Sequence, residues 1–371
     1  MRENRLQMGN CSIPAREDDM FEYFGFETLT APEAAIYFGL GLGVLFGVLA
    51  EITRFCLRRG LVGSPAERRP ALGVWLTALA FAILGTQGAV QMGWISFDDH
   101  RFLNADLPWA AILVGGALFG AGMVLTRGCV SRLTVLTGSG NLRALTVLLI
   151  FAVVAHATLK GVLAPLRTTL ASLTLPLGEA ASLASLAGGG GLVAVLLAGG
   201  ALVYGLRSGA PSGQLALAGA IGGLAALGWV GTGFLLLDDF DPVAMESLSF
   251  TSPMSETLFW TIASTSIPAG FGTGLVGGVL VGAFASAFLA GRFQWQSFDS
   301  PRQTGRYALG ASLMGVGGVL AGGCTLGAGL SGVPTLSTAA LLALLAIAFG
   351  AKLTDVLLSP RSTRAALVPA E

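Results

Sequence analysis

Three cysteines in similar short contexts are the residues of this chain best suited to chemistry. Cys56 stands in RFCLRRG, Cys129 in RGCVSR and Cys324 in GGCTLGAGLSG. A thiol is a soft, weak hydrogen-bond donor, and neighbouring arginines attract anions. The remaining cysteine, Cys11, lies in a polar N-terminal segment and matches none of these contexts. The pattern indicates an anion site, provided that the three contexts meet in the fold.

Metal, nucleotide and nucleic-acid chemistry have little support in the sequence. The four cysteines form no CxxC pair and no metal-ligand spacing. Two histidines, His100 and His156, are too few for a histidine-rich metal site. The chain has no GxxxxGK[ST] loop for ATP and no basic tract. We therefore expect the protein to bind no metal or other cofactor. We also expect it to catalyse no reaction and to have no nucleic-acid partner.

The composition is that of an integral membrane protein. Of 371 residues, 53% are hydrophobic and only 11% are charged, whereas soluble domains carry about a quarter charged residues. The 54 glycines suit transmembrane helices that approach closely or break. Residues 1–30 are polar and lack the apolar core of a signal peptide, so we expect an extramembrane arm there.

Apolar runs predict an all-α, polytopic fold with about nine membrane-spanning helices, since a bilayer core about 30 Å thick needs about 20 residues. Residues 257–268 are a candidate re-entrant piece, and 165–188 read as a loop with a short interfacial helix. The runs lie near 33–55, 71–93, 109–126, 142–163, 190–206, 214–236, 270–290, 306–322 and 337–358.

Charge in the connections between these runs alternates. Arginines gather in the first, third, fifth and seventh connections, as in Arg58 and Arg143, whereas acidic residues dominate the second and sixth. By the positive-inside rule the arginine-rich connections are cytoplasmic. This predicts an N-terminus outside and a cytoplasmic tail over residues 359–371.

An internal repeat surrounds the cysteines. At an offset of 195, Cys129 aligns with Cys324, and five flanking positions are identical as well. The repeat divides the chain into halves over 31–165 and 190–358, joined by a linker over 166–189. Because the preceding spans run in opposite directions, the halves are inverted repeats, a common transporter architecture with broken helices near the midplane. The same glycines are also compatible with simple helix packing.

The three motifs resemble those of the YeeE/YedE family of sulfur transport membrane proteins, over about residues 33–358. The resemblance implies an hourglass-shaped helical fold in the bacterial inner membrane and thiosulfate as cargo. It also implies a path lined by Cys56, Cys129 and Cys324. Some relatives work with a TusA-type sulfur carrier, so such a carrier is an expected cytoplasmic partner.

A thiosulfate path needs groups that replace the hydration of a dianion. Backbone N–H groups at broken helices are suited to this, and the expected breaks lie at Gly128, Gly323, Gly327 and Gly329. Nearby cations would raise the local anion concentration. The candidates are Arg54, Arg127, Arg132, Lys160 and Lys352. The arginines equally obey the positive-inside rule, and lysines at helix ends commonly snorkel.

We hypothesise that the three thiols are successive weak S–H···S stations for the terminal sulfur of thiosulfate. The same features fit a permease for sulfide, a persulfide, a selenium compound or another small anion. A membrane thiol oxidoreductase is a lesser alternative. Glu51, inside the first span, is compatible with an ion pair to Arg54 or with a coupling proton.

Overall fold

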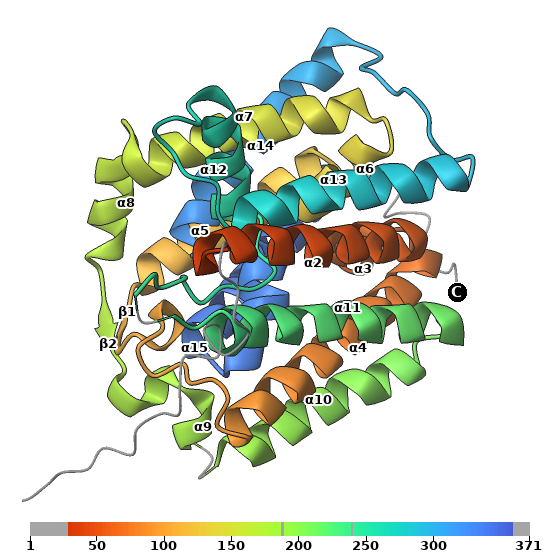
Figure 1. The fold of residues 1–371 in the computed structure, drawn as a ribbon. Coiled ribbons are helices and arrows are strands. Elements are labelled where there is room, and N and C mark those ends of the chain that lie inside the picture. The colour runs from red at the N-terminus through yellow and green to blue at the C-terminus, as the bar shows by residue number, and fades with distance from the viewer. Residues whose placement is uncertain (1–28, 187–188, 239, 359–371) are drawn as a thin grey trace, which may run out of the picture.

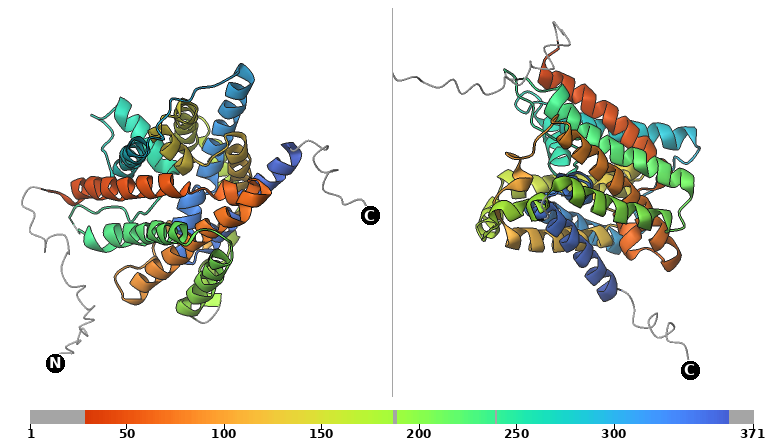
Figure 2. Two further views of the ribbon diagram at one scale, coloured as in Figure 1. Left: turned by 90° about the vertical axis from the view of Figure 1, so that its right-hand side faces the viewer. Right: turned by 90° about the horizontal axis from the view of Figure 1, so that it is seen from below.

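The computed structural model describes residues 29–186, 189–238 and 240–358, so Cys11 and the residues after 358 lie outside it. Its long helices are α2 (Ala31–Thr53), α4 (Pro65–Gln91), α5 (Trp109–Leu125), α7 (Leu142–Lys160), α10 (Gly190–Leu206), α11 (Ser212–Val230), α13 (Phe271–Leu289), α14 (Pro301–Leu320) and α15 (Thr338–Leu358). They form a bundle in which α2, α11 and α13 run in about the same direction, while α4 and α10 are tilted across them (Figures 1 and 2). Each of the nine predicted runs overlaps one of the long helices, although α2, α4, α11 and α14 begin before their runs.

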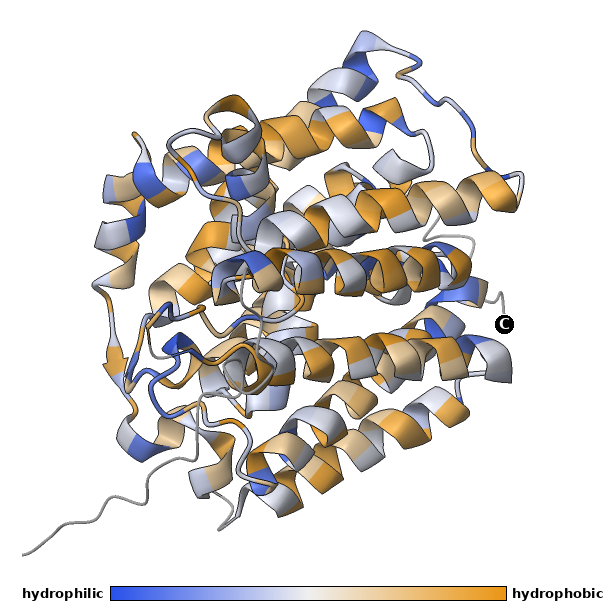
Figure 3. Ribbon diagram, in the orientation of Figure 1, coloured by the Kyte–Doolittle hydropathy of each residue, from blue (hydrophilic) through white to orange (hydrophobic). Residues whose placement is uncertain are grey.

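Eight helical segments of the described chain are long and apolar enough to cross a membrane, and α10 is a shorter apolar helix of 17 residues. Apolar residues cover the long helices, and polar residues concentrate at their ends and in the loops (Figure 3). Such a surface suits hydrocarbon along the helices and water at both ends. The protein is therefore a multi-pass, all-α membrane protein, as its composition predicts.

Short elements connect or continue the long helices. The predicted loop after α7 contains α8, β2, η2 and α9, and α12 covers part of the expected re-entrant piece. The short elements are α3 (Leu57–Val62), η1 (Arg101–Leu103), β1 (Asp106–Leu107), α6 (Val130–Gly138), α8 (Ala164–Ala171), β2 (Leu175–Pro176), η2 (Gly178–Ala181), α9 (Leu183–Leu186), η3 (Gly231–Leu235), α12 (Thr251–Ile262), η4 (Thr325–Gly332) and η5 (Val333–Thr335).

One end of the bundle, the sheet end, gathers connections that the charge pattern predicts outside. Strands β1 and β2 pair antiparallel there. The Ser337 hydroxyl donates to the carbonyl of Phe102 at 2.5 Å, and the Leu183 N–H donates to the Leu336 carbonyl at 2.8 Å. These contacts join the second, fourth and eighth connections.

The opposite end, the arginine end, gathers connections that the charge pattern predicts inside. Arg69 donates to the carbonyl of Arg207 at 2.9 Å, which joins the first and fifth connections. Arg143 pairs with Asp299 at 3.4 Å, which joins the third and seventh. The tertiary contacts thus separate arginine-rich from arginine-poor connections as the alternation predicts.

Glycine allows α2 and α13 to touch backbone to backbone. A Cβ built on Gly43 would lie 2.3 Å from the Leu275 carbonyl oxygen, and one on Gly278 would lie 2.2 Å from that of Leu40. Small residues repeated every four positions permit this close approach in membrane helices. This packing holds α2, and with it the segment of Cys56 that follows its end, against α13.

Reciprocal glycine contacts join α5 and α14. A Cβ on Gly115 would crowd the Gly317 carbonyl at 2.8 Å, and one on Gly310 would crowd the Gly122 carbonyl at 3.0 Å. In the repeat alignment Gly115 corresponds to Gly310, and Gly122 corresponds to Gly317. The two helices therefore exchange equivalent contacts, as related repeats would, and their packing brings the Cys129 and Cys324 segments together.

Candidate functional site

Each of the three repeat cysteines follows a helix break, and the three breaks have the same backbone geometry. Two residues before each cysteine, the chain adopts a left-handed conformation, with φ of 51° at Arg54, 61° at Arg127 and 74° at Gly322. Left-handed residues are usual where a helix ends. Here each one turns the chain out of a long helix, so that a shorter helix starts in a new direction: α3, α6 or η4.

Each cysteine is the N-cap residue of that shorter helix, with an extended backbone. The N–H of Gly327 donates to Sγ of Cys324 at 3.4 Å. The thiols of Cys56 and Cys129 face the corresponding N–H groups, those of Arg59 and Arg132. A sulfur that accepts from the backbone still has its own S–H to donate.

The breaks bring the thiols together in the interior. The side chains of Cys56 and Cys129 lie close enough to influence each other's ionisation, and Cys324 is near enough to Cys129 to interact electrostatically. Their exposed fractions are 6%, 1% and 0% in chain order. All three are free thiols. Three segments that are distant in sequence therefore share one buried cluster, which we call the thiol cluster.

Two hydroxyl groups border Cys129. Ser131 Oγ lies 3.2 Å from its sulfur. Thr325, the residue after Cys324, also approaches it. The buried Thr325 hydroxyl has no oxygen or nitrogen hydrogen-bond partner among the described residues. An unpaired buried hydroxyl is costly, and it is a ready donor for an anion at the cluster.

The predicted cations differ in their distance from the thiol cluster. Arg132 is half-buried, interacts electrostatically with Cys56 and Cys129, and donates to the Ala50 carbonyl at 3.2 Å. Arg54 and Arg127 are exposed at their turns. Lys160 and Lys352 are exposed as well, and neither lines the two cavities described below.

The predicted break glycines are all buried beside the cluster. Gly128 and Gly323 directly precede their cysteines. A Cβ on Gly327 would lie 2.9 Å from the Ser249 hydroxyl, and one on Gly329 would lie 3.1 Å from Trp75. The lack of side chains lets η4 lie close beneath the loop before α12.

The i+3 spacing suggested an ion pair between Glu51 and Arg54, but the structure does not contain it. Its carboxylate accepts from Arg292 Nε at 3.0 Å and from the Ser286 hydroxyl at 3.0 Å, so it joins α2 to the end of α13. Arg54 has a left-handed backbone and is exposed. His156 stacks on Phe259 and lies 3.1 Å from the Ser255 hydroxyl, which is a helix-packing role.

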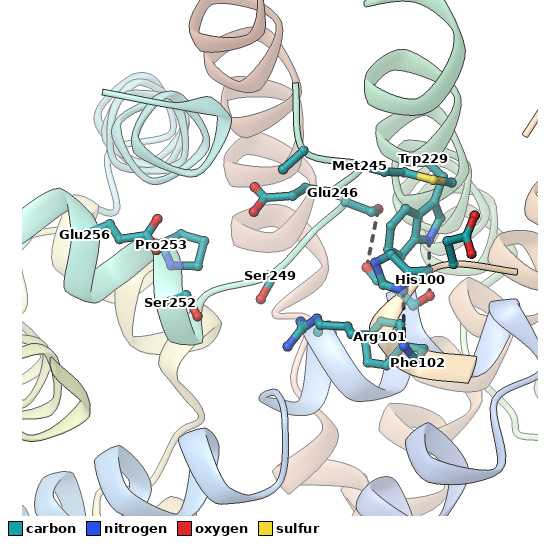
Figure 4. Close-up of a pocket in the computed structure, with 15 residues that line it drawn as sticks. His100, Arg101, Phe102, Trp229, Met245, Glu246, Ser249, Ser252, Pro253 and Glu256 are labelled. Atoms are coloured by element: carbon teal, nitrogen blue, oxygen red, sulfur yellow. Dashed lines mark hydrogen bonds between the residues drawn. The ribbon is translucent and has the colours of Figure 1, made fainter. Parts of the chain in front are cut away.

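A cavity of about 360 Å³ opens at the sheet end, and we call it the vestibule. Ser331 and Gly327, both in η4, lie in its wall, so it reaches the segment that follows Cys324. Figure 4 shows Glu246 and Glu256 on one side and Arg101 and His100 on the other. The charged residues of the wall are Asp99, Arg101, Glu246 and Glu256.

Burial changes the protonation of vestibule groups. Burial, together with the charge of Glu256, raises the pKa of Glu246 to about 7, against the opposing effect of Arg101. Burial and the Arg101 charge lower the pKa of His100 to about 4, so this imidazole is neutral at pH 7. Near neutral pH, Glu246 is therefore the group that changes charge.

A smaller cavity of about 140 Å³ opens at the arginine end. Cys56 lies in its wall with Arg54, Arg59 and Glu67, and Arg59 pairs with Glu67 at 3.3 Å. The thiol cluster thus lies between two cavities, one reaching η4 and one reaching Cys56.

Sequence reasoning did not identify Arg101, Glu246, Ser249 or Thr325 as site residues. Arg101 and Glu246 are separated by more than a hundred positions, and they lie in connections whose charges indicate only the membrane topology. Thr325 had one available signal, since it directly follows a motif cysteine. The others converge only through tertiary contacts.

Comparisons with known proteins extend the similarity beyond the motifs. Residues 52–353 match the family described as sulphur transport. The thiosulfate transporter TsuA of Spirochaeta thermophila is 26% identical over 337 residues, 83% of this chain and 94% of that protein. The thiosulfate transporter TsuA of Escherichia coli is 26% identical over 318 residues, 79% of this chain and 86% of its own. The family match includes all three cysteine segments.

Proposed function

The chain belongs to the sulphur transport family, and we propose that it carries thiosulfate into the cell across the bacterial inner membrane. The sheet end faces outward and the arginine end faces the cytoplasm, as the positive-inside rule requires. The observation that carries the proposal is the thiol cluster between two cavities. The names of the two relatives supply thiosulfate as the cargo.

The cavities suggest an order of contact. The vestibule reaches η4, Cys324 and Cys129 follow, and Cys56 opens to the cavity at the arginine end. Cys324 is therefore the first thiol station and Cys56 the last. Arg132 lies beside the last two stations and attracts the anion inward.

The chemistry of the cluster suits an anion with a terminal sulfur. S–H groups donate weakly, so the anion is held at each station without being trapped. The Thr325 hydroxyl and the first N–H groups of α6 and η4 serve the oxygen atoms. Neutral thiols are required, because a thiolate would repel a dianion.

Labelled thiosulfate uptake by proteoliposomes tests the proposal. We expect unlabelled thiosulfate to compete better than sulfate or sulfide. We expect Cys129→Ala to lower uptake roughly tenfold or more, as when a hydrogen bond to a charged group is lost. Cys129→Ser keeps a donor but not the soft sulfur, so it loses preference for thiosulfate over sulfate.

Cys11→Ala is the matched control, because Cys11 belongs to none of the repeats. Uptake unchanged in all of Cys56→Ala, Cys129→Ala and Cys324→Ala would refute the thiol stations. Better competition by sulfide or selenosulfate would instead assign a different cargo to the same path.

The proximity of Cys56 and Cys129 also suits the alternative of a thiol oxidoreductase, since these two buried thiols interact with each other. That function would cycle the pair through a disulfide, and the number of titratable thiols would fall during turnover. The transport proposal expects a constant number of thiols and uptake that is insensitive to reductant.

We further propose that a TusA-type sulfur carrier accepts the cargo at the arginine end. By removing thiosulfate from the cytoplasmic cavity, the carrier would keep the thiosulfate concentration gradient favourable for uptake. Enclosing the purified carrier in proteoliposomes, with and without its thiol, measures this effect. Equal uptake under both conditions would argue against the partnership.

A further inference from the structure

The vestibule presents a problem for any anion path. Three carboxylates, those of Asp99, Glu246 and Glu256, face the same cavity as one cation, Arg101. Fixed negative charge repels a dianion most strongly in a confined, partly desolvated space. Anion binding in this cavity therefore requires that some of the negative charge be removed.

Glu246 is held at the vestibule wall by its backbone. Its N–H donates to the Thr232 hydroxyl oxygen at 2.9 Å, and its carbonyl accepts from that hydroxyl at 2.7 Å. Its carboxylate makes no hydrogen bond or salt bridge within the described part of the chain. The fixed backbone keeps this carboxylate facing the cavity, so its charge is removed most simply by a proton.

Arg101 has the complementary role. Its guanidinium lies over the Phe102 ring at 4.9 Å, and it forms no salt bridge with a described residue. In Figure 4 it extends toward Ser249, whose hydroxyl lies directly above Gly327 of η4. A cation and a hydroxyl thus meet at the point where the vestibule reaches the segment of Cys324.

We propose that the vestibule is a proton-dependent binding site for divalent sulfur oxyanions, in which Arg101 binds the anion and Glu246 must be protonated first. The choice of cargo rests on the proposed function. The site itself rests on the cavity, on an arginine without a salt bridge, and on a carboxylate carried by a fixed backbone.

The shift in the pKa of Glu246 has the direction that this proposal requires. The raised pKa of Glu246, about 7, makes this carboxyl neutral below pH 7 and anionic above it. Below pH 7 the attraction of Arg101 is weakened only by Asp99 and Glu256. Above pH 7 Glu246 both repels the dianion and screens Arg101. His100, with its pKa near 4, stays neutral throughout this range.

Calorimetric titration of the purified full-length protein with thiosulfate at pH 6 and pH 8 tests this site. We expect wild-type affinity to fall about tenfold between pH 6 and pH 8. Glu246→Gln should bind equally at both pH values, with the wild-type affinity of pH 6. Arg101→Gln should lose about tenfold at pH 6, and Arg101→Lys should recover most of that loss.

Glu179→Gln is the matched control, because Glu179 is an exposed carboxylate at the sheet end outside the vestibule. Wild-type affinity that is independent of pH, or a pH dependence that survives in Glu246→Gln, overturns the inference. Binding with the expected pH dependence, in a protein that moves no thiosulfate across proteoliposomes, would support the vestibule site while refuting the proposed function.

Discussion

At the scale of single residues, the position of each cysteine matters as much as its type. As an N-cap, a cysteine lies where a helix begins and where N–H groups lack intrahelical partners. Serine or aspartate normally occupies this position, because oxygen accepts more strongly than sulfur. Cysteine at all three breaks therefore stabilises the following helices less than serine or aspartate would, but it places a soft sulfur group at the centre of the molecule.

Thr325→Val tests whether the unpaired hydroxyl beside Cys129 contacts the anion. Valine has nearly the same shape, so the cluster should keep its packing. Loss of one hydrogen bond to a charged ligand costs about 1.5 kcal/mol or more, so KM for thiosulfate should rise roughly tenfold. Initial rates of proteoliposome uptake at varied thiosulfate concentration measure the change.

Thr134→Val is the control for this prediction. Thr134 is equally buried in neighbouring α6, but its hydroxyl already donates to the Val130 carbonyl at 2.9 Å. We expect its KM to be unchanged. A similar rise in both variants would mean that general packing, and no anion contact, explains the effect.

At the scale of elements, glycine determines how the broken helices are held. The long helices before the breaks approach one another at backbone distance, α2 against α13 and α5 against α14. Without a hydrophobic driving force inside a bilayer, such van der Waals contact is a main source of helix association. The breaks are therefore placed by rigid neighbours, and three thiols can meet with little freedom.

Gly43→Ala and Gly41→Ala form a matched pair in α2. A Cβ on Gly43 would lie 2.3 Å from the Leu275 carbonyl, whereas one on Gly41 meets nothing within 4 Å. We expect Gly43→Ala to lower stability by about 1–3 kcal/mol through overpacking. Gly41→Ala should be neutral or stabilising by up to about 1 kcal/mol, because alanine favours helix.

Thermal unfolding of the two variants in the same detergent measures this difference. A lowered Tm for Gly43→Ala only is the expected result. Equal Tm values would show that α2 and α13 can separate slightly at no cost, and the backbone contact would then not fix the position of Cys56.

At the scale of the whole molecule, the buried thiol cluster lies between two separate cavities. The vestibule wall contains no cysteine, whereas the cavity at the arginine end includes Cys56. Under the proposed function, the buried cluster must rearrange locally for an anion to pass.

Sided labelling with a membrane-impermeant thiol reagent tests this arrangement in a Cys11→Ser background. From the arginine end, Cys56 should react at least about tenfold faster than Cys324, because an open cavity reaches it. From the sheet end, all three thiols should react slowly. After timed exposure, a second thiol reagent that adds mass to the unreacted cysteines shows how many were modified. Fast labelling of Cys324 from both sides would contradict its burial between the two cavities.

The sequence by itself determined much of the architecture. Hydropathy identified every long helix, because a bilayer imposes a length and an apolar composition on each span. The offset between Cys129 and Cys324 predicted related, inverted segments, and α5 and α14 do exchange equivalent glycine contacts. The resemblance of the cysteine motifs to a sulfur transport family agrees with the family match.

Only the tertiary structure decided which charged residues face a cavity. Arg54, Arg127 and Arg132 looked alike in sequence, yet they differ in the structure. Arg132 interacts with two of the thiols, Arg54 lines the cavity that includes Cys56, and Arg127 is exposed at its left-handed turn. Arg101 and Glu246 meet because two distant loops pack at one end of the bundle. Hydrophobic periodicity constrains a helix along its own length, but the direction of a loop side chain depends on contacts that no local pattern encodes.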